Sequence, residues 1–99
     1  NQTALPHCCQ IDLSDLSHTL KSIAQPHRLQ LLCILKQGPH CVCELQDKLS
    51  LSHNLILHHL KPLKEQGLIS SSKQGRHTYY AIEPAAYAVF CQSLNDVLD

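Results

Sequence analysis

Residues 51–69 form the stretch that most constrains how this chain can fold. Ser52 is a favourable helix N-cap, apolar residues recur behind it at helical spacing, and Gly67 ends the segment where a left-handed residue is needed. The stretch therefore predicts one amphipathic helix with a defined start and end. Its expected apolar positions are Leu55, Ile56, Leu60 and Leu63.

The polar face of this predicted helix carries hydrogen-bond donors and acceptors and hardly any negative charge. Such a face suits base edges and phosphates, although a helix whose polar side meets only water can show the same pattern. The segments on either side favour the first interpretation. The residues of this face are Ser52, His53, Asn54, His58 and Lys61.

A helix-turn-helix is indicated by the segment that comes before this helix. Residues 43–49 have a short helical pattern and are separated from the longer helix by only two residues. Residues 68–73 and 77–82 follow as two predicted strands, joined by a hairpin with Arg76 at its basic tip. Together these elements predict a winged helix-turn-helix.

Three more helices complete the predicted architecture. The first lies between residues 12 and 25 with Asp12 or Ser14 as its cap, the second begins at Pro26, and the last begins at Pro84. We expect a mainly α-helical domain with a small β-hairpin. The residues expected on the apolar sides of the first two helices are Leu13, Leu16, Leu20 and Ile23, then Leu29, Leu32, Cys33 and Leu35.

The expected domain spans residues 12–99, and residues 1–11 are expected to be a flexible arm because they show no periodicity. The last helix carries a wide apolar surface, with Tyr87, Phe90 and Leu94 among its residues. One small domain rarely needs both terminal helices to cover one core. We therefore expect a homodimer, which would place two recognition helices about 34 Å apart, one turn of B-DNA.

The formal net charge of zero argues mildly against nucleic-acid binding, because most such domains are basic. The charge is unevenly distributed, however, with lysines and an arginine in the recognition helix and wing and aspartates near the two ends. The local charge is therefore positive where DNA would bind. The basic residues are Lys61, Lys64, Lys73 and Arg76.

The compartment and the use of cysteine follow from composition. No stretch approaches the roughly 20 apolar residues of a membrane span, and the start of the chain lacks signal-peptide features. We expect a cytoplasmic protein without a membrane partner. Six cysteines in that compartment indicate metal ligands, redox switches or small buried residues rather than structural disulfides.

Four cysteines are candidate metal ligands, namely Cys8 and Cys9 in the arm and Cys41 and Cys43 near the start of the third helix. Residues two apart on a regular helix point to different sides, so Cys41 and Cys43 can share an ion only if Cys41 lies at or before the first turn. The helix N-terminus would also lower the pKa of a thiol there. Cys8 and Cys9 can bind together only if the arm bends.

The number of thiolates would select the ion. Three in a pyramid suit As(III) or Sb(III), and four suit tetrahedral Cd(II), Zn(II) or Pb(II). His7 and His40 flank the thiols as alternative ligands or solvated histidines, and packing roles for Cys41 and Cys43 are the simpler alternative. The two other cysteines, Cys33 and Cys91, are expected to be buried.

These motifs, in this order and spacing, resemble the ArsR/SmtB family of dimeric, metal-responsive winged-helix repressors. The resemblance extends from Leu16 to Ile82. The motifs are Pro26-His27-Arg28-Leu29, Cys41-Val42-Cys43-Glu44-Leu45, Ser52 to Leu60, Glu65-Gln66-Gly67-Leu68-Ile69 and Gly75-Arg76.

The resemblance implies a repressor, not an enzyme, that leaves double-stranded operator DNA when a metal binds. Residues at the start of the recognition helix would contact base edges, Lys61 would contact phosphate, and Lys73 and Arg76 would serve the wing. His59 would pack against the domain. In similar proteins the arm supplies ligands to an ion held by its own subunit or by the opposite subunit. The residues expected at base edges are Ser52, His53, Asn54 and His58.

Some positions depart from the family. Leu57 replaces a small hydroxyl residue, Gln46 replaces a third cysteine, and the last helix lacks the ligands of the family's zinc site. Pro62 falls inside the recognition helix, where it removes a backbone hydrogen bond at a cost of about 3 kcal/mol unless the helix kinks.

Two alternatives change the chemistry. In the first, the fold is kept and Cys33 and Cys91 form a disulfide or polysulfide bridge, as in the persulfide-sensing branch of the family. In the second, Cys8 and Cys9 serve a thiol enzyme, but no acid or base is spaced to support catalysis.

Overall fold

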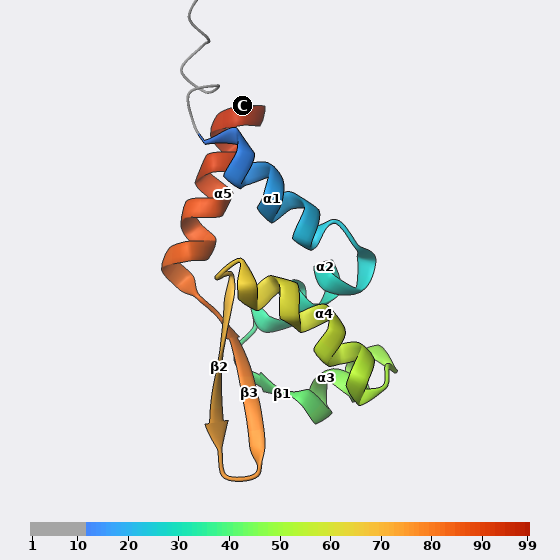
Figure 1. The fold of residues 1–99 in the computed structure, drawn as a ribbon. Coiled ribbons are helices and arrows are strands. Elements are labelled where there is room, and N and C mark those ends of the chain that lie inside the picture. Colours follow the sequence, from blue (N-terminus) through green and yellow to red (C-terminus); the bar gives the residue numbers. More distant parts are fainter. Residues whose placement is uncertain (1–11) are drawn as a thin grey trace, which may run out of the picture.

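The computed structural model describes residues 12–99 and confirms the winged helix-turn-helix. Helices α2, α3 and α4 pack together in the middle, the β2–β3 hairpin extends from one end, and α1 lies beside α5 at the other (Figure 1). The elements are α1 (Leu13–Ile23), α2 (Pro26–Leu35), β1 (His40–Cys41), α3 (Val42–Leu49), α4 (His53–Glu65), β2 (Ile69–Gln74), β3 (His77–Ile82) and α5 (Pro84–Leu98).

The turn between α3 and α4 is closed by local hydrogen bonds. Ser50 adopts the left-handed conformation with φ 55°, and the Leu51 N–H bonds back to the Gln46 carbonyl at 3.4 Å. Ser52 then caps α4, because its hydroxyl oxygen accepts from the Leu55 N–H at 3.2 Å. The predicted cap is confirmed, and it fixes where the recognition helix begins.

The end of α4 is a Schellman motif centred on Gly67, which has φ 77°. The Leu68 N–H bonds to the Leu63 carbonyl at 3.1 Å, and the Gly67 N–H bonds to the Lys64 carbonyl at 2.9 Å. Leu63 and Leu68 are both buried, which adds an apolar contact across the motif. The chain therefore turns sharply from the recognition helix into the wing.

Helix α4 runs through Pro62 without a break. Proline has no N–H to donate to the carbonyl four residues earlier, which belongs to His58. His58 is exposed, so water can bond this carbonyl. The remaining contacts of α4 with α1, α2 and α3 hold the helix together across this position.

The core corrects part of the predicted apolar pattern. Leu29 is 47% exposed and Leu13 is 40% exposed, although both were expected on apolar sides. Helix α2 is apolar on most of its faces, so its sequence alone does not select the buried side. The core cluster is Leu31, Leu32, Leu35, Val42, Leu45, Ile56, Leu60, Leu63, Leu68 and Ile69.

The buried side of α4 also differs by one position. Leu55 is 46% exposed, whereas Ile56, Leu60 and Leu63 are fully buried and His59 is 7% exposed. The expectation that Leu55 lies on the core side is therefore wrong, whereas His59 packs against the domain as the family resemblance implied. Arg28 supplies the buried His59 with a hydrogen bond.

A third strand, β1, was not predicted. The sheet has the order β1-β3-β2, and β1 pairs antiparallel with β3 through His40 opposite Tyr80 and Cys41 opposite Tyr79. Two residues are too short to show the alternation by which strands are recognised in sequence. This short pairing attaches the start of α3 to the wing.

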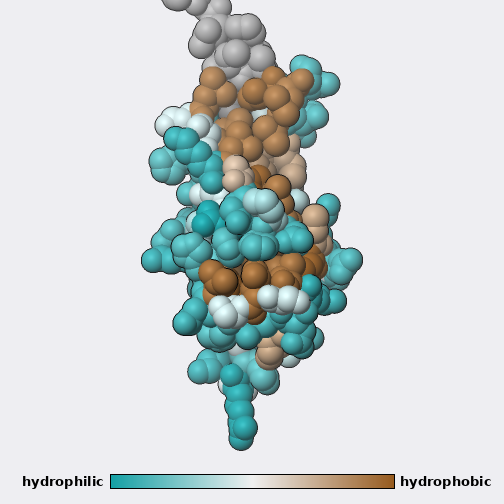
Figure 2. Space-filling view, turned by 90° about the vertical axis from the view of Figure 1, so that its right-hand side faces the viewer, coloured by the Kyte–Doolittle hydropathy of each residue, from teal (hydrophilic) through white to brown (hydrophobic). Residues whose placement is uncertain are grey.

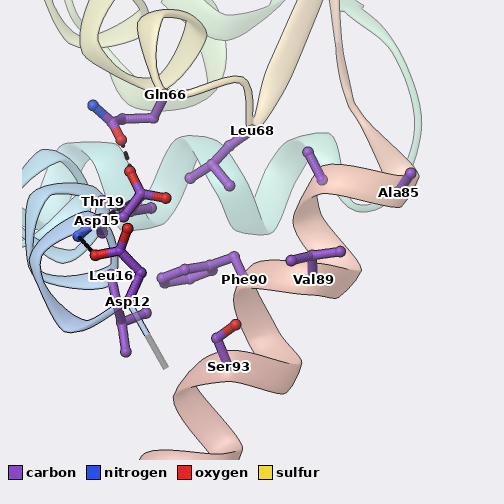
Figure 3. A pocket seen from close by; sticks show the side chains of 11 residues that line it. Asp12, Asp15, Leu16, Thr19, Gln66, Leu68, Ala85, Val89, Phe90 and Ser93 are labelled. Carbon is purple, nitrogen blue, oxygen red and sulfur yellow. Dashed lines mark hydrogen bonds between the residues drawn. The ribbon is translucent and has the colours of Figure 1, made fainter. Parts of the chain in front are cut away.

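A groove of about 480 Å³ lies between α1 and α5 (Figure 3). The Thr19 hydroxyl donates to the Gln66 side-chain oxygen at 2.9 Å, which links α1 to the end of α4. No residue of α5 is buried, and Val89 is 66% exposed. Figure 2 shows a broad apolar surface at this end of the molecule.

Among residues 12–99, no helix is long and apolar enough to cross a membrane.

Replacing Gly67 with alanine should destabilise the fold, because an L-residue in the left-handed region costs about 1–2 kcal/mol. We expect the free energy of unfolding, measured with urea, to fall by about this amount. The control is Lys36→Ala, at an exposed C-cap with φ −63°. An unchanged midpoint for Gly67→Ala would contradict the prediction.

Candidate metal and DNA-binding sites

Cys41 and Cys43 lie side by side at the start of α3. Cys41 is the N-cap, with an extended backbone at φ −82° and ψ 163°, and its Sγ lies 3.1 Å from the Sγ of Cys43. Because Cys41 precedes the first turn, the two side chains converge, which is the geometry that their spacing requires for sharing an ion. Cys8 and Cys9 lie outside the described residues.

The N-cap itself is held by Glu44. The Cys41 N–H donates to Glu44 Oε1 at 2.9 Å, in the reciprocal direction of a capping box. This hydrogen bond lowers the pKa of the Glu44 carboxyl, so the side chain is a carboxylate at neutral pH. Glu44 thereby fixes the extended conformation that brings the thiols together.

The pKa of Cys41 is raised, contrary to the lowering expected at a helix N-terminus. The hydrogen bond with Cys43 is the largest cause, and burial of Cys41 adds to it. Cys41 is 5% exposed, whereas Cys43 is exposed to solvent. A neighbouring thiol and loss of water outweigh the helix terminus here.

His77 joins this pair from the wing. Its Nδ1 lies 3.6 Å from the Sγ of Cys43, and the ligand atoms of Cys41, Cys43 and His77 all lie within 4.8 Å of one another. Two sulfurs and an imidazole nitrogen are the donors that soft and borderline ions prefer. The sequence analysis missed His77 because it is 34 residues from Cys43 and only the sheet brings it there.

The other histidine considered beside the thiols has a different partner. His40 Nδ1 lies 2.7 Å from the Gly38 carbonyl oxygen. His7 lies outside the described residues.

The predicted DNA contacts of α4 all reach the surface. Ser52, His53, Asn54, His58 and Lys61 are exposed. The Ser52 hydroxyl oxygen also accepts the capping hydrogen bond from the Leu55 N–H. His53 Nδ1 lies 3.4 Å from Gln46 Oε1 of α3.

The predicted contacts of the wing are exposed as well. Lys73 is near the end of β2, and Arg76 follows Gly75 in the turn, where φ is 64°.

A hollow of about 430 Å³ separates α4 from β3. Lys64 donates to the Ser71 hydroxyl oxygen at 2.7 Å and so connects α4 to β2 beside this hollow. This hydrogen bond links the recognition helix to the wing. The hollow is lined by Leu57, Leu60, Lys61, Lys64, Glu65 and Tyr80.

His59 packs inside the domain, as expected, and receives a hydrogen bond from Arg28. The Arg28 Nε donates to His59 Nδ1 at 3.2 Å, and the rings of His27 and His58 lie 5.3 and 5.1 Å away between centroids. Burial lowers the pKa of His59, and the charges of these neighbours lower it further. His59 is therefore neutral in the folded protein at neutral pH.

Cys33 and Cys91 are exposed, so the expectation that both are buried is wrong. Cys33 lies on the outer side of α2, and α5 buries none of its residues. Burial raises the pKa of Tyr87, and Cys91, one turn further along α5, and Cys33 raise it further.

Comparisons with known proteins place this architecture in a family. The family model described as "Bacterial regulatory protein, arsR family" matches residues 25–71. The arsenical resistance operon repressor of Staphylococcus aureus is 31% identical over 81 residues, which cover 82% of this chain and 78% of that protein. The chain belongs to the ArsR family.

Other ArsR-family comparisons agree. The biofilm growth-associated repressor of Agrobacterium fabrum is 30% identical over 86 residues, covering 79% of this chain and 74% of that protein. The structure of HlyU from Vibrio cholerae matches with a TM-score of 0.73 at 27% identity, covering 84% of this chain and 91% of that one. This ArsR-family chain is thus a winged-helix transcriptional regulator.

The buried His59 should make the stability of this ArsR-family fold depend on pH. Its folded pKa lies below the unfolded value of 6.5, so the unfolded chain binds more protons as pH falls through 6.5. The stability contributed by neutral His59 is therefore present above this pH and lost below it. We expect urea unfolding to show a smaller loss of stability from pH 7.5 to 5.5 in His59→Gln, which keeps an acceptor for Arg28.

The control for this comparison is His18→Gln, at an exposed position of α1. Its loss of stability should match that of the unmodified protein. Equal losses in all three proteins would show that His59 does not contribute.

Proposed function

We propose that this protein is a homodimeric transcriptional repressor that binds operator DNA and releases it when a soft metal or metalloid ion binds. The ligands are thiolates of Cys41 and Cys43 together with Cys8 and Cys9 of the arm at residues 1–11. The single observation that carries the proposal is the 3.1 Å approach of two thiol sulfurs at the start of the helix that precedes the recognition helix. The similar arsenical resistance operon repressor supports it.

The inducer belongs to one of two classes on this proposal. As(III) or Sb(III) would bind three thiolates, and Cd(II), Pb(II) or Zn(II) would bind four. Each thiol that binds gives up its proton, so binding strengthens as pH rises.

The recognition helix reads the DNA through its first turns. Ser52, His53, Asn54 and His58 contact base edges, and Lys61 contacts phosphate. Leu57, exposed on the same helix, offers an apolar contact for a thymine methyl group. The wing adds Lys73 and Arg76 along the backbone.

A second copy of the chain covers the apolar end of the molecule. The groove between α1 and α5, with the exposed side chains of Val89 and Leu98 on α5, supports this interface. Apolar surface of this kind is favourable to bury, and a two-fold pair matches two half-sites on DNA.

Metal binding acts on DNA binding through α3. Helix α3 packs directly on α4, and its N-cap residue is itself a ligand. An ion that draws Cys41 and Cys43 toward the arm shifts α3 and with it the separation of the two recognition helices. A coupling free energy of about 1–3 kcal/mol suffices for a large change in occupancy.

The phosphate role of Lys61 predicts a weaker dependence on salt. Each lost phosphate contact reduces the slope of log K against log salt by about 0.9, so Lys61→Ala should reduce it by about 1.8 in a dimer. Fluorescence anisotropy with a DNA fragment selected for binding, at several salt concentrations, measures the slope. The control is Lys21→Ala, at an exposed position of α1, which should keep the slope of the unmodified protein. A slope for Lys61→Ala equal to that for Lys21→Ala would exclude the phosphate contact of Lys61.

A second candidate function keeps the DNA-binding role and replaces the signal. Cys33 of α2 and Cys91 of α5 are both exposed to solvent, where an oxidant can reach their thiols. Oxidation by hydrogen peroxide would join them in a disulfide, with two electrons and two protons passing to the peroxide to give two waters. Two molecules of a small persulfide would instead join them as a trisulfide, with one sulfur between the two cysteine sulfurs, and would release two thiols and one hydrogen sulfide.

Paired variants distinguish the two signals. We expect As(III) or Cd(II) to weaken DNA binding at least about tenfold in the unmodified protein and in Cys33→Ser/Cys91→Ser. This response should disappear in Cys41→Ser/Cys43→Ser and in Cys8→Ser/Cys9→Ser. Two results together would favour the second candidate. Peroxide would release DNA from every variant except Cys33→Ser/Cys91→Ser, and neither ion would release DNA.

A further inference from the structure

We propose that His77 of the wing is a third protein ligand of the ion held by Cys41 and Cys43, and that the bound ion therefore fastens the wing to α3 in one subunit. This inference rests on the proposed function and deepens it. It also selects the inducer class, because a nitrogen ligand suits Cd(II) or Zn(II).

The pairing of two strands brings Cys43 and His77 close together. Cys41 pairs with Tyr79 in the antiparallel register of β1 and β3. Cys43 follows in the first turn of α3, and His77 begins β3 two residues before Tyr79; their ligand atoms lie 3.6 Å apart. The pairing of β1 with β3 thus brings the start of α3 beside the start of β3.

Two of the distances between ligand atoms can be compared directly with a tetrahedral metal centre. With Zn–S and Zn–N bonds of about 2.3 and 2.0 Å, tetrahedral angles place a sulfur and a nitrogen about 3.5 Å apart and two sulfurs about 3.8 Å apart. The Cys43–His77 distance of 3.6 Å already matches. The 3.1 Å between the sulfurs of Cys41 and Cys43 has to widen by about 0.7 Å, within reach of a small side-chain rotation.

For Cd(II) or Zn(II), His77 therefore replaces one of the four thiolates named above, and the remaining position of the tetrahedron is open for one further ligand. On binding, each thiol that is protonated loses its proton to solvent, whereas His77 donates the lone pair of neutral Nδ1. As(III) keeps a lone pair of its own and takes three thiolates in a pyramid. His77 would then remain outside the centre, so the histidine separates the two classes of ion.

The location of His77 gives the ion a direct effect on the wing. His77 is the first residue of β3, directly after Arg76 in the turn, and it pairs with Gln74 at the end of β2. An ion on His77 therefore restrains the base of the turn that carries the DNA-binding arginine. Metal binding acts on the wing in addition to the recognition helix.

Nuclear magnetic resonance of the reduced, full-length protein tests the ligand directly. With ¹⁵N-labelled histidine and ¹¹³Cd(II), we expect a scalar coupling between cadmium and Nδ1 of His77, which a merely structural role would not produce. His77→Asn should lose this coupling and bind Cd(II) at least about tenfold more weakly, since even outer partners of a metal ligand change affinity by 10–100-fold. Its affinity for As(III) should not change.

The matched control is His18→Asn, the same substitution at an exposed histidine of α1. It should keep both the coupling and the affinity for Cd(II). Cadmium that consumes thiols without coupling to His77 would overturn the role of His77 and leave the thiol sensor intact. Cadmium that consumes no thiols, while As(III) still consumes them, would overturn the role of His77 alone. If neither ion consumes thiols, both proposals are overturned.

Discussion

The short antiparallel pairing of β1 with β3 is the constraint on which the functional end of this molecule depends. Through two residues, His40 and Cys41, it holds the chain extended just before α3 and against the wing. The same extended conformation makes Cys41 an N-cap, turns its sulfur toward Cys43, and brings His77 within reach. One piece of backbone pairing thus links the helix-turn-helix, the wing and the thiols.

Most element boundaries could be predicted because their causes are local. Ser52, Pro26, Pro84 and Gly67 each determine a helix end through their own side chain or backbone conformation, and the structure has the ends at these residues. The buried faces were predicted less well. Helix α2 has apolar residues on most sides, and on α4 the expected Leu55 is exposed. His59 was expected against the domain only from the family resemblance, because its partner Arg28 is 31 residues away.

The candidate metal site was likewise predictable only where its geometry has a local cause. The convergence of Cys41 and Cys43 followed from their spacing once Cys41 was placed before the first turn. His77 had no signal in spacing, because its position depends on a two-residue strand that no periodicity reveals. The raised pKa of Cys41 likewise depends on burial and on the neighbouring thiol, which are tertiary effects. Local chemistry identified the thiols, and the strand pairing identified their third neighbour.

The free edge of the wing has a consequence for how the protein behaves at high concentration. Strand β2 lies at the edge of the sheet, and its backbone groups on that side have no strand partner within the described part of the chain. An unpaired edge invites the strands of other molecules to add to it. After Ile69 this strand is entirely polar, with three serines, Lys73 and Gln74, so an intruding strand would gain little apolar contact and would have to approach a cation. The composition that leaves the wing hydrated for DNA thereby also protects it from aggregation.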